Sequence, residues 1–211
     1  KEAAKRGDQV VQIQPIARIK IQPETSNLPV WKKIIVKSKL PDNIKPLHEL
    51  SRNLWWCWNY RAAELFDLID SALWQSTNKN PIQLLDKVSY DRLAQLAESE
   101  EYVNKLNAVY HEFKEYLAQP YSTEQSIAYF SMEYGLHNSL KTYSGGLGIL
   151  AGDYLKEASD HKVNIVAVGL LSRYGYFTQQ ITTRGEQQAT YDFQHFSKLP
   201  IRPIKDDAGH F

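Results

Sequence analysis

The residues best placed to do chemistry are the glycines of Tyr143-Ser-Gly-Gly-Leu-Gly148, which precede an apolar helical stretch. Glycines allow positive φ angles and a close approach of the backbone to a ligand. The start of a helix adds unpaired N–H groups and the positive end of a dipole. Gly145, Gly146, Leu147 and Gly148 therefore form a candidate phosphate-binding loop. A tight turn without a ligand fits equally well, because the segment is neither a Walker A loop nor a Rossmann Gly-x-Gly-x-x-Gly.

Glu133 is the second candidate, because it follows the predicted strand Ile127–Ser131. Open α/β sheets bind their ligands at the carboxyl ends of the strands. A carboxylate there can accept a hydrogen bond from a sugar hydroxyl or orient a water molecule. A structural salt bridge explains Glu133 equally well.

Three neighbouring residues have weaker claims. His137 can contact substrate, although a solvated loop histidine is the more common case. Asp153, one turn into the predicted helix, is expected to complement the helix dipole. Arg173 is expected to pair with a carboxylate rather than bind phosphate.

Trp55, Trp56 and Trp58 can form a flat surface for carbohydrate. Their place in an apolar helical stripe favours a bundle core instead, and Cys57 among them is expected to be buried and inert. No set of His, Cys and carboxylate residues has metal-ligand spacing, and no serine has the context of a nucleophile elbow.

The elements that must hold these residues change type along the chain. All five tryptophans lie at or before Trp74, whereas nine of the ten glycines lie at or after Gly135. This distribution predicts a helical first half and a second half of strands and tight turns.

In the first half, Trp31–Lys37 is a candidate strand. A helix capped by Asp42 is expected to carry Leu47, Leu50, Leu54, Trp55 and Trp58, the last three buried. Further helices are predicted over residues 62–74, from Asn80-Pro81, over 89–97 and over 99–117, the last ended by Gln119-Pro120.

In the second half, Ile127–Ser131 and Val163–Leu171 are apolar runs typical of strands buried on both faces. A helix from Gly148 to about His161 joins them, which predicts a βαβ unit and a parallel sheet. Residues 174–182 and 187–193 flank Thr183-Arg-Gly185 and suggest a hairpin.

Composition excludes several classes of protein. Lys+Arg number 25 and Asp+Glu 24, so the net charge of +1 argues against general affinity for nucleic acid or anionic membranes. No apolar run reaches the ~20 residues of a membrane span, and the charged first residues do not resemble a secretory signal. One cysteine excludes an internal disulfide and favours a cytoplasmic location.

Four ordered motifs together resemble the α-glucan (glycogen/maltodextrin) phosphorylases, most closely the bacterial branch with a Trp-rich helical N-terminal domain. They are Asn53-Leu-Trp-Trp-Cys-Trp58, Ala128-Tyr-Phe-Ser-Met-Glu-Tyr-Gly135, the segment from Tyr143 to Asp160, and Val168-Gly-Leu-Leu-Ser-Arg-Tyr-Gly-Tyr-Phe-Thr-Gln179. The similarity runs from about Trp31 to about Ile204.

The resemblance implies an α/β fold: a helical N-terminal region (31–120) followed by the first part of a Rossmann-like domain of the glycosyltransferase-B type (121–211), with 1–30 as a linker or tail. The implied reaction transfers a terminal glucosyl unit of an α-1,4-glucan to inorganic phosphate, giving glucose 1-phosphate, with pyridoxal phosphate as cofactor. It implies that Gly145, Gly146, Leu147 and Gly148 lie over the phosphate and glucosyl sites and that Glu133 lies near the catalytic cleft. It leaves homo-oligomerisation open.

The sequence departs from the family pattern at two points. Gly135 stands where many members have a tyrosine that packs near the cofactor. The cofactor-lysine motif Ser-Gly-Thr-x-Asn-Met-Lys is absent, since the only methionine is Met132. We therefore expect this chain to be an N-terminal fragment that is inactive alone and carries one wall of the active site.

Two alternatives remain. Nucleotide-sugar-dependent glycogen or starch synthases have a Lys-x-Gly-Gly-Leu-Gly loop, but Tyr143 takes the lysine position here and Lys141 lies four residues before Gly145. Phosphate-dependent release of glucose units favours phosphorylase, and transfer from ADP-glucose favours synthase. A non-catalytic scaffold fragment is the second alternative.

Overall fold

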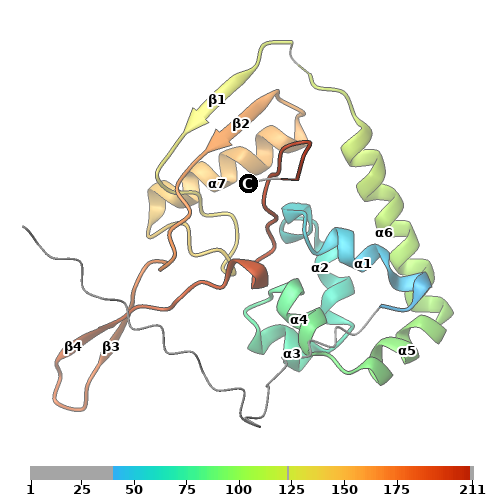
Figure 1. The fold of residues 1–211 in the computed structure, drawn as a ribbon, viewed down its shortest axis with the longest axis horizontal. Helices are drawn as coiled ribbons and strands as arrows, with labels where there is room; N and C mark the ends of the chain where they lie inside the picture. Colours follow the sequence, from blue (N-terminus) through green and yellow to red (C-terminus); the bar gives the residue numbers. More distant parts are fainter. Residues whose placement is uncertain (1–39, 123, 210–211) are drawn as a thin grey trace, which may run out of the picture. The chain divides into compact units, whose positions relative to one another are not determined.

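A computed structural model describes residues 40–122 and 124–209 (Figure 1). The predicted tail (1–30) and the predicted strand Trp31–Lys37 lie outside these residues. The described residues combine helices, concentrated in the first half, with two small sheets.

The first half is helical, as its composition predicts. Its α-helices are α1 (Pro46–Leu50), α2 (Tyr60–Asp67), α3 (Ser71–Ser76), α4 (Pro81–Lys87), α5 (Tyr90–Glu98) and α6 (Glu100–Ala118), with 3-10 helices at Asp42–Ile44 and Leu54–Cys57. Helices α4, α5 and α6 begin within one residue of the starts predicted at Asn80-Pro81, Ser89 and Ser99, and each has a side-chain cap. Asn80 accepts hydrogen bonds from the N–H groups of the first turn of α4, and Ser89 and Ser99 do the same for α5 and α6.

Two predicted helices are broken, which corrects the sequence interpretation. The helix expected after Asp42 is three short pieces, and Asp42 caps none of them, because it lies inside the first and pairs with Lys45. Extended backbone at Asn53 starts a new 3-10 turn, and the Asn53 side chain accepts from the N–H of Trp55. The helix expected over 62–74 divides at Asp70, whose carboxylate caps α3.

The core of the described residues lies within this helical region and is rich in aromatic rings. Trp56 packs edge-on against Phe66 and Trp74, with ring centroids 6.0 and 5.8 Å apart, and Trp55 lies 5.4 Å from Phe113. The largest fully buried side chains are Trp56, Phe66, Phe113, Ile44, Leu47, Leu50, Leu65, Ile69, Leu84, Leu93, Leu106 and Val109. Leu117, near the end of α6, is 48% exposed.

The predicted βαβ unit is confirmed. Strands β1 (Ile127–Phe130) and β2 (Ile165–Val168) pair in parallel, with Ile127 opposite Ile165, and α7 (Gly146–Asp160) connects them. The predicted hairpin is also present, as β3 (Thr178–Ile181) and β4 (Gln187–Thr190), with Gly185 at a φ of 79° in the turn. A short 3-10 helix, Phe196–Lys198, follows.

The two parallel strands are not buried on both faces, contrary to the sequence interpretation. Phe130 is 71% exposed and Val166 is 63% exposed. The reason is architectural, because a sheet of two strands has no central strand that neighbours can cover. The apolar residues of these strands show that the strands are suited to burial. Whether the side chains are buried depends on the layers that pack against the sheet.

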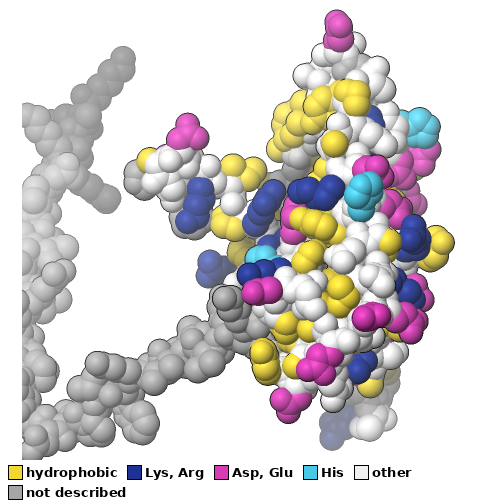
Figure 2. All heavy atoms as spheres, turned by 90° about the vertical axis from the view of Figure 1, so that its right-hand side faces the viewer, with side chains coloured by type: hydrophobic (Ala, Val, Ile, Leu, Met, Phe, Trp, Pro, Cys, Tyr) yellow, Lys and Arg dark blue, Asp and Glu magenta, His cyan; other side chains and the backbone are white. Residues whose placement is uncertain are grey.

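Surface charge is mixed on the face shown in Figure 2, where acidic and basic side chains are interspersed. Ion pairs such as Arg61–Glu112 and Lys114–Glu49 link the helices of this region. Among residues 40–122 and 124–209, no helix combines the length and the apolar character that a membrane crossing needs.

Candidate active-site edge

The candidate residues gather at one edge of the β1–β2 pair. Because the strands are parallel, both carboxyl ends lie at the same edge, where Ser131–Glu133 follows β1 and Gly169 follows β2. The chain returns to this edge before α7, so the helix begins there (Figure 1). The sheet topology thus brings Glu133 and the glycine loop together, although they are separated by more than ten residues in the sequence.

Glu133 is held against the entrance of α7 by Ser144. Its Oε1 accepts from the Ser144 hydroxyl at 2.6 Å, and its Oε2 accepts from the Ser144 N–H at 3.2 Å. These two hydrogen bonds, with a further one from the N–H of Gly145, lower the pKa of the Glu133 carboxyl against a smaller opposing effect of burial. Glu133 is therefore an anionic acceptor near neutral pH. It can accept a hydrogen bond from a hydroxyl group or a water molecule, and it has no proton to donate.

Ser144 is the site residue that sequence reasoning missed. The only signal available was a hydroxyl residue one position before the glycines, which is a common context for a cap. Here the serine holds the carboxylate, while the helix N-cap itself is Gly145, which makes no side-chain cap hydrogen bond.

The glycines of the loop divide into two kinds. A Cβ added at Gly145 or Gly146 would meet no heavy atom within 4 Å, and neither residue has a positive φ. The positive-φ interpretation of this loop is therefore wrong. Neither backbone conformation nor packing within the described chain requires glycine at 145 or 146, whereas close approach of a ligand would require it.

Gly148 is a packing glycine. A Cβ there would lie 2.5 Å from the Cβ of Tyr143 and 2.9 Å from Glu133 Oε2. Its N-terminal neighbour Leu147 is 83% exposed. Gly148 thus lets the loop and Glu133 lie close to α7, while Leu147 presents an apolar side chain to the solvent beside them.

A cavity of about 360 Å³ lies at this edge, lined by Glu133, Tyr143, Ser144 and the segment after β2. Lys141 also borders it and pairs with Asp192 at 2.6 Å. The first N–H groups of α7 have no partner within the helix, so the edge offers hydrogen-bond donors beside a carboxylate. The carboxylate can accept a hydrogen bond from a hydroxyl group of a ligand, and the N–H groups can bind an anion beside it.

The weaker candidates lie elsewhere. His137 is half-buried and does not line the cavity at the edge. It packs against Trp56 with ring centroids 4.6 Å apart, and burial lowers its pKa to about 4. Asp153 pairs along α7 with Lys156 at 3.7 Å. Arg173 lies over the ring of Phe193 and forms no ion pair with a carboxylate of the described residues, contrary to the expectation.

The tryptophans contribute to the core rather than to a carbohydrate surface. Trp55 and Trp56 are 3% and 1% exposed. Leu54 and Trp58, which were expected to be buried, are half-buried at its margin. Cys57 is also half-buried, and burial raises the pKa of its thiol to about 11. Within the part of the chain that the structure describes, no three His, Cys, Asp or Glu residues form a set that could hold a metal ion.

Comparison with known proteins agrees with the motifs. Residues 40–140 match a family described as "Protein of unknown function (DUF3417)". The chain is 39% identical over 183 residues to the maltodextrin phosphorylase of Thermococcus litoralis, which covers 82% of the chain and 22% of that protein. It is 40% identical over 191 residues to the glycogen phosphorylase of Mycobacterium tuberculosis, covering 84% of the chain and 22% of that protein.

The glycogen phosphorylase of Aquifex aeolicus is similarly related, with 40% identity over 168 residues that cover 77% of the chain and 24% of that protein. No solved structure matches the chain significantly. The resemblance predicted from the motifs is confirmed: the chain is a homologue of the maltodextrin and glycogen phosphorylases and spans 22–24% of the length of these relatives.

Proposed function

We propose that this chain forms one wall of the active site of an α-1,4-glucan phosphorylase, which transfers a terminal glucosyl unit to inorganic phosphate and yields glucose 1-phosphate. The observation that carries the proposal is the pairing of Glu133 with Ser144 beside Gly145 and Gly146, where nothing among the described residues requires glycine. The names of the relatives supply the substrate class.

The residues divide the task by their chemistry. Glu133 accepts a hydrogen bond from a glucosyl hydroxyl or from an ordered water molecule. The backbone of Gly145 and Gly146 lies where an oxyanion can approach without meeting a side chain. N–H groups of a helix start that are already oriented stabilise negative charge as it develops in a transition state. Gly148 acts indirectly, because it allows Glu133 to lie against the helix.

The chain's own residues do not fit covalent attachment of pyridoxal phosphate. The lysine at this edge, Lys141, is engaged by Asp192, and the cofactor-lysine motif does not occur among the 211 residues. We assign the cofactor to a part of the complete polypeptide outside these 211 residues.

The same proposal extends to the architecture. The parallel β1–β2 pair with α7 is the starting unit of a Rossmann-like domain (121–211) of the glycosyltransferase-B type, preceded by a helical domain (31–120) and by 1–30 as a linker. Exposed apolar side chains on the strands, Phe130 and Val166 among them, support this, because they suit neighbouring layers.

Phosphorolysis is the direct test. The complete polypeptide is incubated with glycogen or maltoheptaose, with and without inorganic phosphate, and glucose 1-phosphate is measured. We expect release that depends on phosphate and falls strongly in Glu133→Gln, a change that keeps the size of the side chain and removes its charge. Transfer of glucose from ADP-glucose without phosphorolysis would assign the chain to the synthases. Absence of both activities would favour the scaffold alternative.

A further inference from the structure

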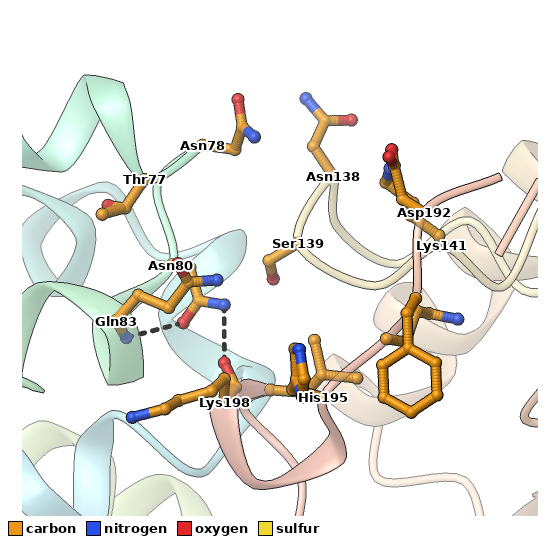
Figure 3. Close-up of a pocket in the computed structure, with 13 residues that line it drawn as sticks. Thr77, Asn78, Asn80, Gln83, Asn138, Ser139, Lys141, Asp192, His195 and Lys198 are labelled. Carbon is orange, nitrogen blue, oxygen red and sulfur yellow. Dashed lines mark hydrogen bonds and ion pairs between the residues drawn. The ribbon is translucent and has the colours of Figure 1, made fainter. Parts of the chain in front are cut away.

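A second cavity, of about 270 Å³, is lined by neither Glu133 nor the glycine loop. Figure 3 shows residues that line it. Three segments line it: the turn and first residues of α4 (77–83), the loop 138–141, and the segment 192–199. Lys141 borders both this cavity and the one at the edge. Residues far apart in the sequence therefore build one partly open surface with both polar and apolar groups.

Neutral groups dominate the lining of this cavity. Figure 3 shows the side chains of Asn78, Asn138 and Ser139 around its upper part. Amide and hydroxyl groups both donate and accept hydrogen bonds. The Asn78 side-chain amide forms no hydrogen bond within the described residues, so its N–H donors and its oxygen acceptor are available to a ligand.

The charged groups of the lining are neutralised in pairs. Lys141 pairs with Asp192 at 2.6 Å, and Lys198 pairs with Asp86 at 2.5 Å. An anion such as a phosphate would have to break one of these pairs to gain a cation. The electrostatics therefore favour a ligand without charge.

The lining of the cavity also contains an aromatic ring and an amide whose oxygen lacks a hydrogen-bond donor. Phe193 is 44% exposed and lies edge-on to His195, with ring centroids 4.9 Å apart. Gln194, also in the lining, is 7% exposed, and its Oε1 has no hydrogen-bond partner. A buried acceptor without a donor is costly, and a ligand rich in hydroxyl groups can supply the donor.

We infer that this cavity binds a glucosyl unit of an α-glucan, at a place distinct from the Glu133 edge. A sugar matches the lining, because its hydroxyl groups can pair with amides and its apolar face can pack on the part of the Phe193 ring that Arg173 and Tyr174 leave exposed. The volume lies just below the range of roughly 300–1,000 Å³ typical of drug-sized ligands, which suits one or two sugar rings. The choice of α-glucan rests on the proposed function, and the hydroxyl-rich class rests on the lining alone.

Asn78 provides a sharp test, because its φ of 53° lies in the left-handed region that glycine adopts freely. Asn78→Gly removes the amide and leaves the backbone conformation favourable. The neighbour Lys79 has a φ of 55° but does not line the cavity. Lys79→Gly is therefore a matched control for any effect of glycine on the turn. Phe193→Leu removes the ring and keeps apolar bulk.

Maltotriose is titrated into the ¹⁵N-labelled 211-residue chain and followed by amide chemical shifts. We expect saturable shifts at residues 77–83, 138–141 and 192–199, weakened about tenfold or more in Asn78→Gly and Phe193→Leu and unchanged within about twofold in Lys79→Gly. The tenfold is what losing one good hydrogen bond to the ligand produces. Absence of shifts in these segments, or equal binding by the wild type and Asn78→Gly, overturns the inference.

Cellobiose in a parallel titration tests the linkage. Binding as strong as that of maltotriose overturns the α-glucan assignment. Because these titrations contain no phosphate and measure no turnover, their failure leaves the phosphorolysis test of the complete polypeptide unaffected. Conversely, a polypeptide that binds maltotriose in this cavity but releases no glucose 1-phosphate refutes the proposed function alone.

Discussion

Two glycines at the start of α7 are expected to respond in opposite directions to the same substitution. At Gly146 a Cβ meets nothing within 4 Å, and the residue does not have a positive φ. Alanine there reduces the conformational entropy of the unfolded chain and suits a helix, so Gly146→Ala should be neutral or stabilise the chain by up to about 1 kcal/mol. The glycine is then unnecessary for folding.

Gly148→Ala is the contrasting case. Its Cβ would lie 2.5 Å from the Cβ of Tyr143 and 2.9 Å from Glu133 Oε2, so the loop or the helix must move. Overpacking of this kind costs about 1–3 kcal/mol. The two variants share one helix turn and one chemical change, and they differ only in what surrounds the added methyl group.

Urea unfolding of the chain, followed by tryptophan fluorescence, measures both free energies. The slope of the free energy against urea concentration should stay constant, so that the midpoint reports stability. A loss of more than about 1 kcal/mol in Gly146→Ala would refute the reasoning, because it would show a structural need for glycine that the packing does not contain.

Turnover of the complete polypeptide then separates function from folding. If the Gly146 backbone approaches the transferred phosphate, a methyl group there should lower kcat by roughly a hundred- to a thousandfold, the effect of losing one oriented donor to transition-state charge. A stable Gly146→Ala variant with normal turnover would remove Gly146 from the site.

Four further predictions concern other residues. The pKa of His137 is lowered from an ordinary 6.5 to about 4, so the unfolded chain binds the proton at a higher pH than the folded chain does. The free energy of unfolding should therefore fall as the pH drops from about 6.5 to 4. Unfolding curves of His137→Gln should show a weaker dependence on pH. Alkylation of Cys57 by iodoacetamide at pH 8 should be at least about a hundredfold slower than that of a free thiol, because burial raises its pKa to about 11; mass spectrometry gives the rate. Trp58→Phe should cost about 1 kcal/mol in urea unfolding, because it removes the hydrogen bond from Trp58 Nε1 to Asp160. The 211-residue chain, treated with pyridoxal phosphate and borohydride, should show no stoichiometric site-specific adduct by mass spectrometry, since it lacks the cofactor-lysine motif.

Local signals in the sequence predicted local structure well. The helix starts predicted at Asn80-Pro81, Ser89 and Ser99 are present, and the side chains of Asn80, Ser89 and Ser99 accept hydrogen bonds from N–H groups two or three residues further along the chain. Asn53 and Asp70 cap helices in the same way, but they lie within apolar stripes whose spacing predicts continuous helices. The two predicted helices are therefore too long, because the caps interrupt them.

Contacts between distant residues could not be predicted in this way. His137 is neutral and partly enclosed because Trp56, far away in the sequence, packs on its ring. The exposure of β1 and β2 depends on which layers surround the sheet, and no pattern within Ile127–Phe130 describes those layers. For the site, the motifs identified Glu133 and the glycines, but the distinction between open Gly146 and crowded Gly148 needs coordinates.

Helix α7 connects the two halves of the described chain, because it is held at both ends. At its start, Ser144 and Glu133 hold the loop that delivers the glycines. At its end, Asp160 accepts hydrogen bonds from Trp58 Nε1 at 3.0 Å and from the Tyr116 hydroxyl at 2.8 Å, both from the helical region. A rigid helix about 20 Å long transmits the direction of one end to the other. The helical region therefore helps to orient the glycine loop. The family match over residues 40–140 contains Trp58, Tyr116 and Glu133, so it includes a partner of each end of α7.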